Sequence, residues 1–216
     1  MVKWFFGLVS RLNGPILRNS KDSAGQIISL DDRSSLDDLM ENFDTIRKEA
    51  LDALPYAKPI QGDLFFGESL TDDGRWKRVY LKWYSKPSKL AEKLFPKTLA
   101  IMAPHSDIRL AMISILEPGA VIKPHSGVWA GSIRVHIALE APDDENCFIN
   151  VGGIKYVWKT GELVAFNDTY PHFVMNNTNK RRVVLFLDVE RKMKNRFWQF
   201  IVWAFNTTVA RATSRE

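Results

Sequence analysis

From residue 109 to residue 190 the chain alternates apolar and polar residues in short runs rich in β-branched side chains, and turn dipeptides separate these runs. The dipeptides are Pro-Gly at 118–119, Gly-Gly at 152–153 and Asn-Asn at 176–177. Alternation of this kind is typical of half-buried strands, because successive side chains of a strand point to opposite faces. Several short strands with such punctuation predict an all-β sandwich or barrel.

Helices are expected to flank this β region. Residues 35–54 place apolar side chains at three- and four-residue steps, behind Ser34 or Ser35 as a cap, which predicts one amphipathic helix. A second helix is predicted through "SKLAEKLF", continuing after Pro96 as "KTLAIMA". The fold class is therefore expected to be mainly β with flanking helices. A chain of 216 residues can bury one sizeable core, so we expect a single domain.

Composition limits the partners and the kind of metal site. Lysine and arginine number 30 against 25 acidic residues, a net charge of +5 that favours an anionic partner, although an ordinary basic surface explains it equally well. The single cysteine, Cys147, excludes an intramolecular disulfide and every multi-cysteine metal site, and it weakly indicates a reducing compartment. Any metal must therefore be held by histidine and oxygen ligands.

Both ends of the chain are aromatic and basic. Trp4, Phe5 and Phe6 lie between Lys3 and Arg11, and "RKMKNRFWQFIVWAF" occupies residues 191–205. No stretch reaches the roughly 18 apolar residues of a spanning helix, and we expect no signal peptide. Such segments either lie in a membrane interface, with rings among acyl chains and cations at headgroups, or cover the domain's own core.

Two predicted strands carry arginine among apolar residues. In "SIRVHIAL", Arg134 and His136 share one face with Ser132, and the isoleucine and valine side chains share the other. In "RRVVLFLD", Arg182 lies on the face of Val184 and Phe186. An unpaired guanidinium in an apolar interior costs several kcal/mol, so each arginine is expected to meet a carboxylate. That carboxylate can belong to a ligand or to an internal ion pair, unless the face is exposed.

Three of the four histidines fall in the β region. His125 and His172 are each expected at a strand end, and His136 lies inside a strand. A lone histidine is usually an ordinary polar residue. Small barrels, however, gather such side chains at one mouth, where two imidazoles can hold a divalent first-row ion.

These motifs in their order carry a family resemblance. "HSG" and "RVH", followed by "WKTGE", "FNDTYPH" and "RRVVLFLDVER", resemble the aspartyl/asparaginyl β-hydroxylase family of iron- and 2-oxoglutarate-dependent oxygenases over roughly residues 76–191. "GRWKRVYLKWY", "FPKT", "AGSIRVHIAL" and "VARATS" extend the likeness, toward bacterial lipid A hydroxylases, over roughly residues 36–213. The resemblance implies a double-stranded β-helix core, the jelly-roll or cupin-like fold. We expect an aromatic and basic segment at 1–34, helices plus this oxygenase domain at 35–190, and an amphipathic helix at 191–216.

The resemblance also implies a site. The family's iron-binding histidines fall on His125 and His172, and the residues that hold the distal carboxylate of 2-oxoglutarate fall on Arg182 and Ser114. The residues near the chelating end of 2-oxoglutarate fall on Arg134 and His136. Molecular oxygen is the second cosubstrate.

One position departs from the pattern of the lipid A hydroxylases. They carry "HRD" where this chain has "HSG", so Gly127 replaces a carboxylate ligand. The third iron ligand is then expected to be water or Asp168, and a halide is a further alternative. Two histidines plus water resembles the arrangement of the animal-type β-hydroxylases.

The resulting hypothesis is a hydroxylase that adds a 2-hydroxyl to an acyl chain of lipid A or a related membrane lipid. Two alternatives remain: β-hydroxylation of Asp or Asn side chains in a peptide, and a non-catalytic cupin-like binding module. We expect a lipid or peptide partner and no nucleic acid. The expected location is the cytoplasm, with peripheral contact to the anionic inner face of the bacterial inner membrane as a further option.

Overall fold

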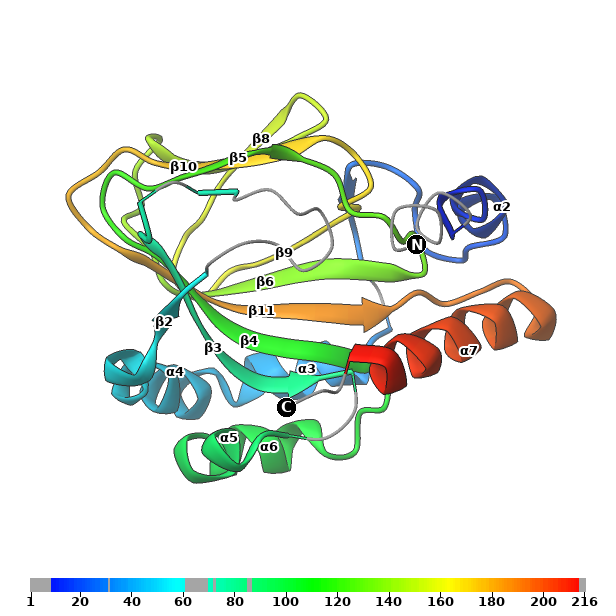
Figure 1. The fold of residues 1–216 in the computed structure, drawn as a ribbon, viewed down its shortest axis with the longest axis horizontal. Coiled ribbons are helices and arrows are strands. Elements are labelled where there is room, and N and C mark those ends of the chain that lie inside the picture. The colour runs from blue at the N-terminus through cyan, green and yellow to red at the C-terminus, as the bar shows by residue number, and fades with distance from the viewer. Residues whose placement is uncertain (1–8, 31, 61–69, 72, 85–86, 214–216) are drawn as a thin grey trace.

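Two antiparallel sheets face each other in the computed structural model, which describes residues 9–30, 32–60, 70–71, 73–84 and 87–213 (Figure 1). The major sheet has the strand order β1-β9-β6-β11-β4-β3-β2, and the minor sheet has the order β5-β10-β7-β8. The strands span β1 (Ile27–Ile28), β2 (Lys58–Pro59), β3 (Trp76–Trp83), β4 (Ile108–Leu116), β5 (Val121–His125), β6 (Ser132–Glu140), β7 (Cys147–Val151), β8 (Ile154–Val157), β9 (Leu163–Phe166), β10 (His172–Asn176) and β11 (Arg182–Glu190).

The path from β4 to β11 confirms the double-stranded β-helix. β4, β6, β9 and β11 belong to the major sheet, while β5, β7, β8 and β10 belong to the minor sheet, so the chain crosses repeatedly between the two. The turns at 118–119 and 152–153 lie where they were predicted, with Gly119, Gly152 and Gly153 at positive φ. Closing the two sheets over each other leaves a space between them that side chains of both can reach.

Helices cover the other face of the major sheet (Figure 1). They are α3 (Ser34–Glu41), α4 (Phe43–Asp52), the short 3-10 turn η1 (Leu54–Tyr56), α5 (Lys89–Leu94) and α6 (Pro96–Met102). Their apolar faces and that face of the sheet form the largest core cluster, which includes Leu39, Ile46, Ile113, Val135 and Leu185. The isoleucine and valine side chains of β6 lie in this core, as the alternation predicted.

The single helix predicted over 35–54 is wrong, because the helix breaks at Asn42. The backbone of Asn42 leaves the helical region (φ −100°, ψ 20°), and its side-chain amide donates to the Asp38 carbonyl at 2.9 Å. Asparagine competes with the helix in this way by bonding nearby backbone groups. The predicted serine cap is also wrong: Arg33 precedes α3, and Ser35 Oγ donates to Asp107 at 2.7 Å instead.

The β region also begins earlier than predicted. β3 pairs with β4 and so joins the major sheet before residue 109, with Val79 and Leu81 in the core and Trp76, Arg78 and Tyr80 on the face toward the minor sheet. Alternation was present in "RWKRVYLKW", but lysine and arginine on both faces obscured it.

Helix α7 (Arg196–Thr213) lies within the segment 191–216 that was expected to be helical, and a short helix α2 (Asn13–Arg18) lies near the N-terminus. Both pack on a small core cluster that includes Ile16, Trp129, Met193 and Val202. Trp4, Phe5 and Phe6 lie outside the described residues. Among those that are described, no helix combines the length and the apolar character required to cross a bilayer.

Candidate active site

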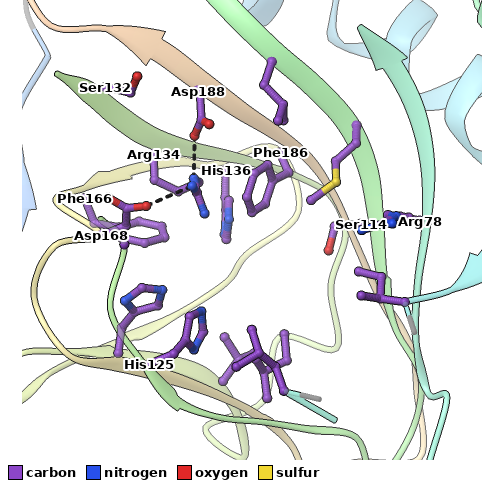
Figure 2. A pocket seen from close by; sticks show the side chains of 18 of the residues that line it. Arg78, Ser114, His125, Ser132, Arg134, His136, Phe166, Asp168, Phe186 and Asp188 are labelled. Carbon is purple, nitrogen blue, oxygen red and sulfur yellow. Dashed lines mark hydrogen bonds and ion pairs between the residues drawn. The ribbon is translucent and has the colours of Figure 1, made fainter. Parts of the chain in front are cut away.

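A cavity of about 210 Å³ lies between the two sheets. Its wall is formed by the inward faces of β3, β4, β6 and β11 on one side and of β5, β7 and β10 on the other (Figure 2). Most of the wall is apolar, and the polar side chains that reach it include all six that the family resemblance singled out: His125, His172, Ser114, Arg134, His136 and Arg182.

His125 and His172 meet at one end of this cavity. His125 ends β5, His172 begins β10, and the two residues are direct partners in the antiparallel pairing of these strands. Their ring centroids lie 4.1 Å apart with the planes tilted by 53°. The expectation that these two histidines converge is therefore correct. The pairing of β5 with β10 brings together two residues that are far apart in the sequence.

Each ring is oriented by its own strand. His125 Nδ1 lies 2.8 Å from the Lys123 carbonyl oxygen, and His172 Nδ1 lies 2.9 Å from the Tyr170 carbonyl oxygen. A carbonyl only accepts, so each ring donates from Nδ1–H, which leaves Nε2 as the ring nitrogen that can bind a metal. Burial, and then the neighbouring His125, lower the pKa of His172 to about 3. Two imidazoles whose Nδ1–H is held by a carbonyl are a usual metal-binding arrangement.

Gly127 and Asp168 share one space beside the histidine pair. A Cβ atom at position 127 would overlap the carboxylate of Asp168, and the Gly127 N–H donates to the Asp168 carbonyl at 2.6 Å. The Asp168 side chain thus fills the space where a side chain two residues after His125 would begin. In the part of the chain that the structure describes, no cluster of three or more His, Cys, Asp or Glu side chains forms a metal site.

Arg134 is held by two internal carboxylates (Figure 2). Its Nε donates to Asp188 Oδ1 at 2.6 Å and its Nη2 donates to Asp168 Oδ2 at 2.8 Å, while Tyr84 Oη donates to Asp188 Oδ2 at 3.1 Å. Burial alone would lower the pKa of Arg134, but the Asp188 and Asp168 carboxylates raise it above its ordinary value. Arg134 therefore forms the internal ion pair that the sequence left open, and its expected contact with 2-oxoglutarate stays a prediction.

Arg182 is the opposite case. It is 1% exposed, and its Nε and Nη1 have no hydrogen-bond partner among the described residues. Its guanidinium lies 4.6 Å from the ring centroid of Trp158. Burial lowers the pKa of Arg182 to about 10, so the group is still a cation at neutral pH. A buried cation without a counter-ion calls for an anion from outside the chain.

His136 adds two more polar atoms to this part of the cavity. Neither of its ring nitrogens has a hydrogen-bond partner within the described chain, and the ring lies among Trp158, Phe166 and Phe186. Burial, and then the charges of Arg182 and Arg134, hold its pKa well below the ordinary value, so the ring is neutral. Ser114 Oγ, on β4, accepts a hydrogen bond from Trp76 Nε1 at 3.0 Å and keeps its own hydroxyl hydrogen to donate.

Three cavity residues were missed by the sequence reasoning. Asp188 lies six residues after Arg182 on β11, so the alternation that places Arg182 also places Asp188 on the cavity face. Arg78 follows from the same rule on β3, and its guanidinium lies 4.6 Å from the Tyr80 ring centroid. Tyr84 gave no such signal, because its backbone adopts a positive φ of 49° just after the strand ends.

Comparison with known proteins gives one family and a small set of relatives. The sequence model of a family described as aspartyl/asparaginyl beta-hydroxylase matches residues 40–192. An ornithine lipid ester-linked acyl 2-hydroxylase of Rhizobium tropici is 32% identical over 152 residues, which are 70% of this chain and 53% of that protein. The aspartyl/asparaginyl beta-hydroxylase of Mus musculus is 30% identical over 156 residues, 70% of this chain and 21% of that protein.

The chain thus spans about half the length of the bacterial relative and about a fifth of the mouse one. Among solved structures, a prolyl-4-hydroxylase of Pseudomonas putida aligns with a TM-score of 0.45 at 13% identity, over 69% of this chain and 88% of that one.

Proposed function

The chain belongs to the aspartyl/asparaginyl β-hydroxylase family, and on that premise we propose that it is an Fe(II)- and 2-oxoglutarate-dependent hydroxylase of a membrane-lipid acyl chain. One observation carries the proposal: a histidine pair lines the same cavity as a buried guanidinium, that of Arg182, which has no ion-pair partner among the described residues. The pair suits a divalent metal, and the guanidinium suits an anionic cosubstrate.

His125 and His172 would hold the iron through Nε2. Their Nδ1 bonds to backbone carbonyls fix both rings before a metal arrives, so little side-chain freedom is lost on binding. Iron together with 2-oxoglutarate and O2 supplies the oxidising chemistry when bound. The protein's own part is to orient the substrate and to keep water away from the reacting carbon.

Arg182, Ser114 and His136 would hold 2-oxoglutarate. The guanidinium of Arg182 pairs with the distal carboxylate, and the Ser114 hydroxyl donates a second hydrogen bond. His136, being neutral, can both donate and accept a hydrogen bond. Binding of a dicarboxylate would therefore satisfy buried polar atoms that have no partner in the described protein.

An acyl chain suits the rest of the cavity wall, which is lined by Leu110, Met112, Ile122, Ile149 and Val174. The relative in Rhizobium tropici is named as an acyl 2-hydroxylase, which supports the same substrate class for this chain, and lipid A or a related membrane lipid is the substrate we propose. Such a lipid resides in a bilayer, so the enzyme would meet it at a membrane surface.

The alternative is β-hydroxylation of Asp or Asn in a peptide, which the named activity of the mouse relative supports. An aspartyl substrate brings a carboxylate next to the reacting carbon and needs a cation there. Arg134 already pairs with Asp168 and Asp188, so in the peptide alternative Arg78, which also lines the cavity, would have to meet that carboxylate.

Two experiments test the proposal. Anaerobic titration of the apoprotein with Fe(II) and 2-oxoglutarate should produce the weak visible absorption of a chelated keto acid, and its absence would favour a non-catalytic binding module. Mass spectrometry of lipids from an expressing strain should show a 2-hydroxylated acyl chain that His172→Ala abolishes. An unchanged lipid profile, together with succinate release stimulated by an Asp-containing peptide, would support the peptide alternative.

A further inference from the structure

The outer face of α7 carries large aromatic side chains that the domain does not cover. Phe197 is 65% exposed, Phe200 is 58% exposed and Trp203 is 47% exposed. Because they are three residues apart, the three side chains follow one stripe of the helix, and the rings of Phe200 and Trp203 lie 5.8 Å apart. The opposite side of α7 is buried at Val202 and Asn206. α7 thus has apolar side chains on two sides, one toward the core and one toward solvent.

A cluster of cations lies beside the start of this helix. Ser20 and Met193 form an antiparallel bridge, with Lys21 N–H donating to the Lys192 carbonyl and Lys194 N–H donating to the Asn19 carbonyl, each at 2.8 Å. This pairing brings two short segments together, and their exposed basic residues are Arg18, Lys21, Lys192, Lys194 and Arg196. Residues 18–21 and 192–196 contain no acidic residue, and none of the five cations forms an ion pair with a residue that the structure describes. The neighbouring carboxylate, that of Asp22, pairs with Arg33 at 2.7 Å and accepts a hydrogen bond from the Lys192 N–H at 2.8 Å.

The same helix reaches the cavity. Phe205 lines the cavity wall and stacks on Trp129 at a centroid distance of 3.9 Å, and Trp129 Nε1 donates to Asn206 Oδ1 at 3.0 Å. Trp129 follows His125 by only four residues, in the segment that also contains Gly127. α7 therefore connects its exposed aromatic stripe to the loop beside the histidine pair.

From these placements we infer that the aromatic stripe of α7 (Phe197, Phe200 and Trp203) and the adjacent cation cluster form a docking surface for an anionic lipid bilayer. Exposed rings beside uncompensated cations match an interfacial layer in which acyl chains lie below anionic headgroups. The inference rests on the proposed function for its purpose, since docking there places α7, whose inner side lines the cavity at Phe205, against the layer that holds the proposed substrate. It concerns binding to the surface and is independent of the chemistry at the histidines.

The test is sedimentation of the full chain with vesicles in the absence of iron and 2-oxoglutarate. Wild-type protein should bind vesicles containing phosphatidylglycerol, bind pure phosphatidylcholine weakly, and lose most binding at high salt. Replacing Phe197, Phe200 and Trp203 by Ser, or Lys192, Lys194 and Arg196 by Gln, should weaken the partition coefficient on the order of a hundredfold. Matched controls are Lys89, Lys93 and Lys97 replaced by Gln, and Tyr56 and Leu90 replaced by Ser, all exposed on the helical layer. Both controls should bind like wild type.

Three results would overturn the inference: no preference of the wild type for anionic vesicles, equal losses in the control variants, or a concentration-dependent dimer that the aromatic variant abolishes. The last would identify a second copy of the chain as the partner of the stripe. The keto-acid absorption of the wild-type protein separates this inference from the proposed function. If the wild type shows the absorption but binds no anionic vesicles, only the docking surface fails, whereas vesicle binding by a wild type that lacks the absorption leaves the surface and removes the hydroxylase.

Discussion

The Asp168 carboxylate occupies the space into which a side chain at Gly127 would extend. The same carboxylate accepts a hydrogen bond from Arg134, so a residue two positions after His125 and an arginine on β6 are coupled through one aspartate. Glycine at 127 is therefore required by its neighbour, and any larger residue there must displace a charged group from a buried ion pair.

Gly127→Asp should consequently destabilise the apoprotein by about 2–4 kcal/mol, since it separates Asp168 from Arg134 and brings a second carboxylate beside it. Urea unfolding measures this loss. The double variant Gly127→Asp with Asp168→Gly removes the overlap and moves the carboxylate to the other loop, so it should be more stable than the single variant. Equal stability of the single variant and the wild type would show that the two positions do not compete for space.

Arg182→Met should separate stability from cosubstrate binding. It removes a buried cation that has no counter-ion among the described residues, so the free energy of unfolding should stay the same or rise by about 1–3 kcal/mol. Affinity for 2-oxoglutarate, measured by anaerobic titration with Fe(II), should fall at least ~30-fold. A variant that unfolds and loses affinity together would instead indicate a structural role for this guanidinium.

Loss of the Asp188 carboxylate should lower the free energy of unfolding more than loss of the Tyr84 hydroxyl that donates to it. Asp188→Asn removes the charge that faces Arg134 and should cost about 3 kcal/mol, whereas Tyr84→Phe removes one hydrogen bond and should cost about 1 kcal/mol. Chemical denaturation of both variants and of the double variant measures the coupling. Fully additive effects would contradict a shared network.

The apoprotein should lose stability in acid partly through His136. Burial, and then Arg182 and Arg134, lower its pKa in the folded protein, while the unfolded chain binds a proton near pH 6.5. The unfolded state thus binds more protons than the folded state below that pH, and the free energy of unfolding falls as the pH falls. His136→Gln should flatten the change between pH 7.5 and pH 5.5 in urea unfolding. A slope equal to that of wild type would mean that other groups account for the acid sensitivity.

Strand faces could be predicted from the sequence because they depend on a local period of two. That Arg134 and His136 share one face of β6, and that Arg182 shares one face of β11 with Phe186, followed from alternation alone, and the structure shows that both faces line the cavity. The convergence of His125 with His172 was expected from their places at strand ends and from the family resemblance. The partner of Arg134 could not be predicted, because Asp188 lies opposite it only through the register of β11 with β6, which joins residues far apart in the chain.

In the helical layer, the hydrophobic pattern predicted one helix where the structure has two. The apolar spacing runs through residue 42, but one asparagine amide bonding to Asp38 divides the helix in two. The role of Gly127 was likewise visible only in part, since the sequence shows an absent carboxylate and only the packing shows that Asp168 has taken its space.

The direct pairing of His125 with His172 across β5 and β10 also implies at which stage of folding the chain could bind a metal. A slip of one residue in that pairing would send one imidazole to the far side of the minor sheet, so partly folded chains with that register lack a chelating pair. Loading with iron would then be a late event in maturation, and ion uptake would report that these two strands have reached their final alignment.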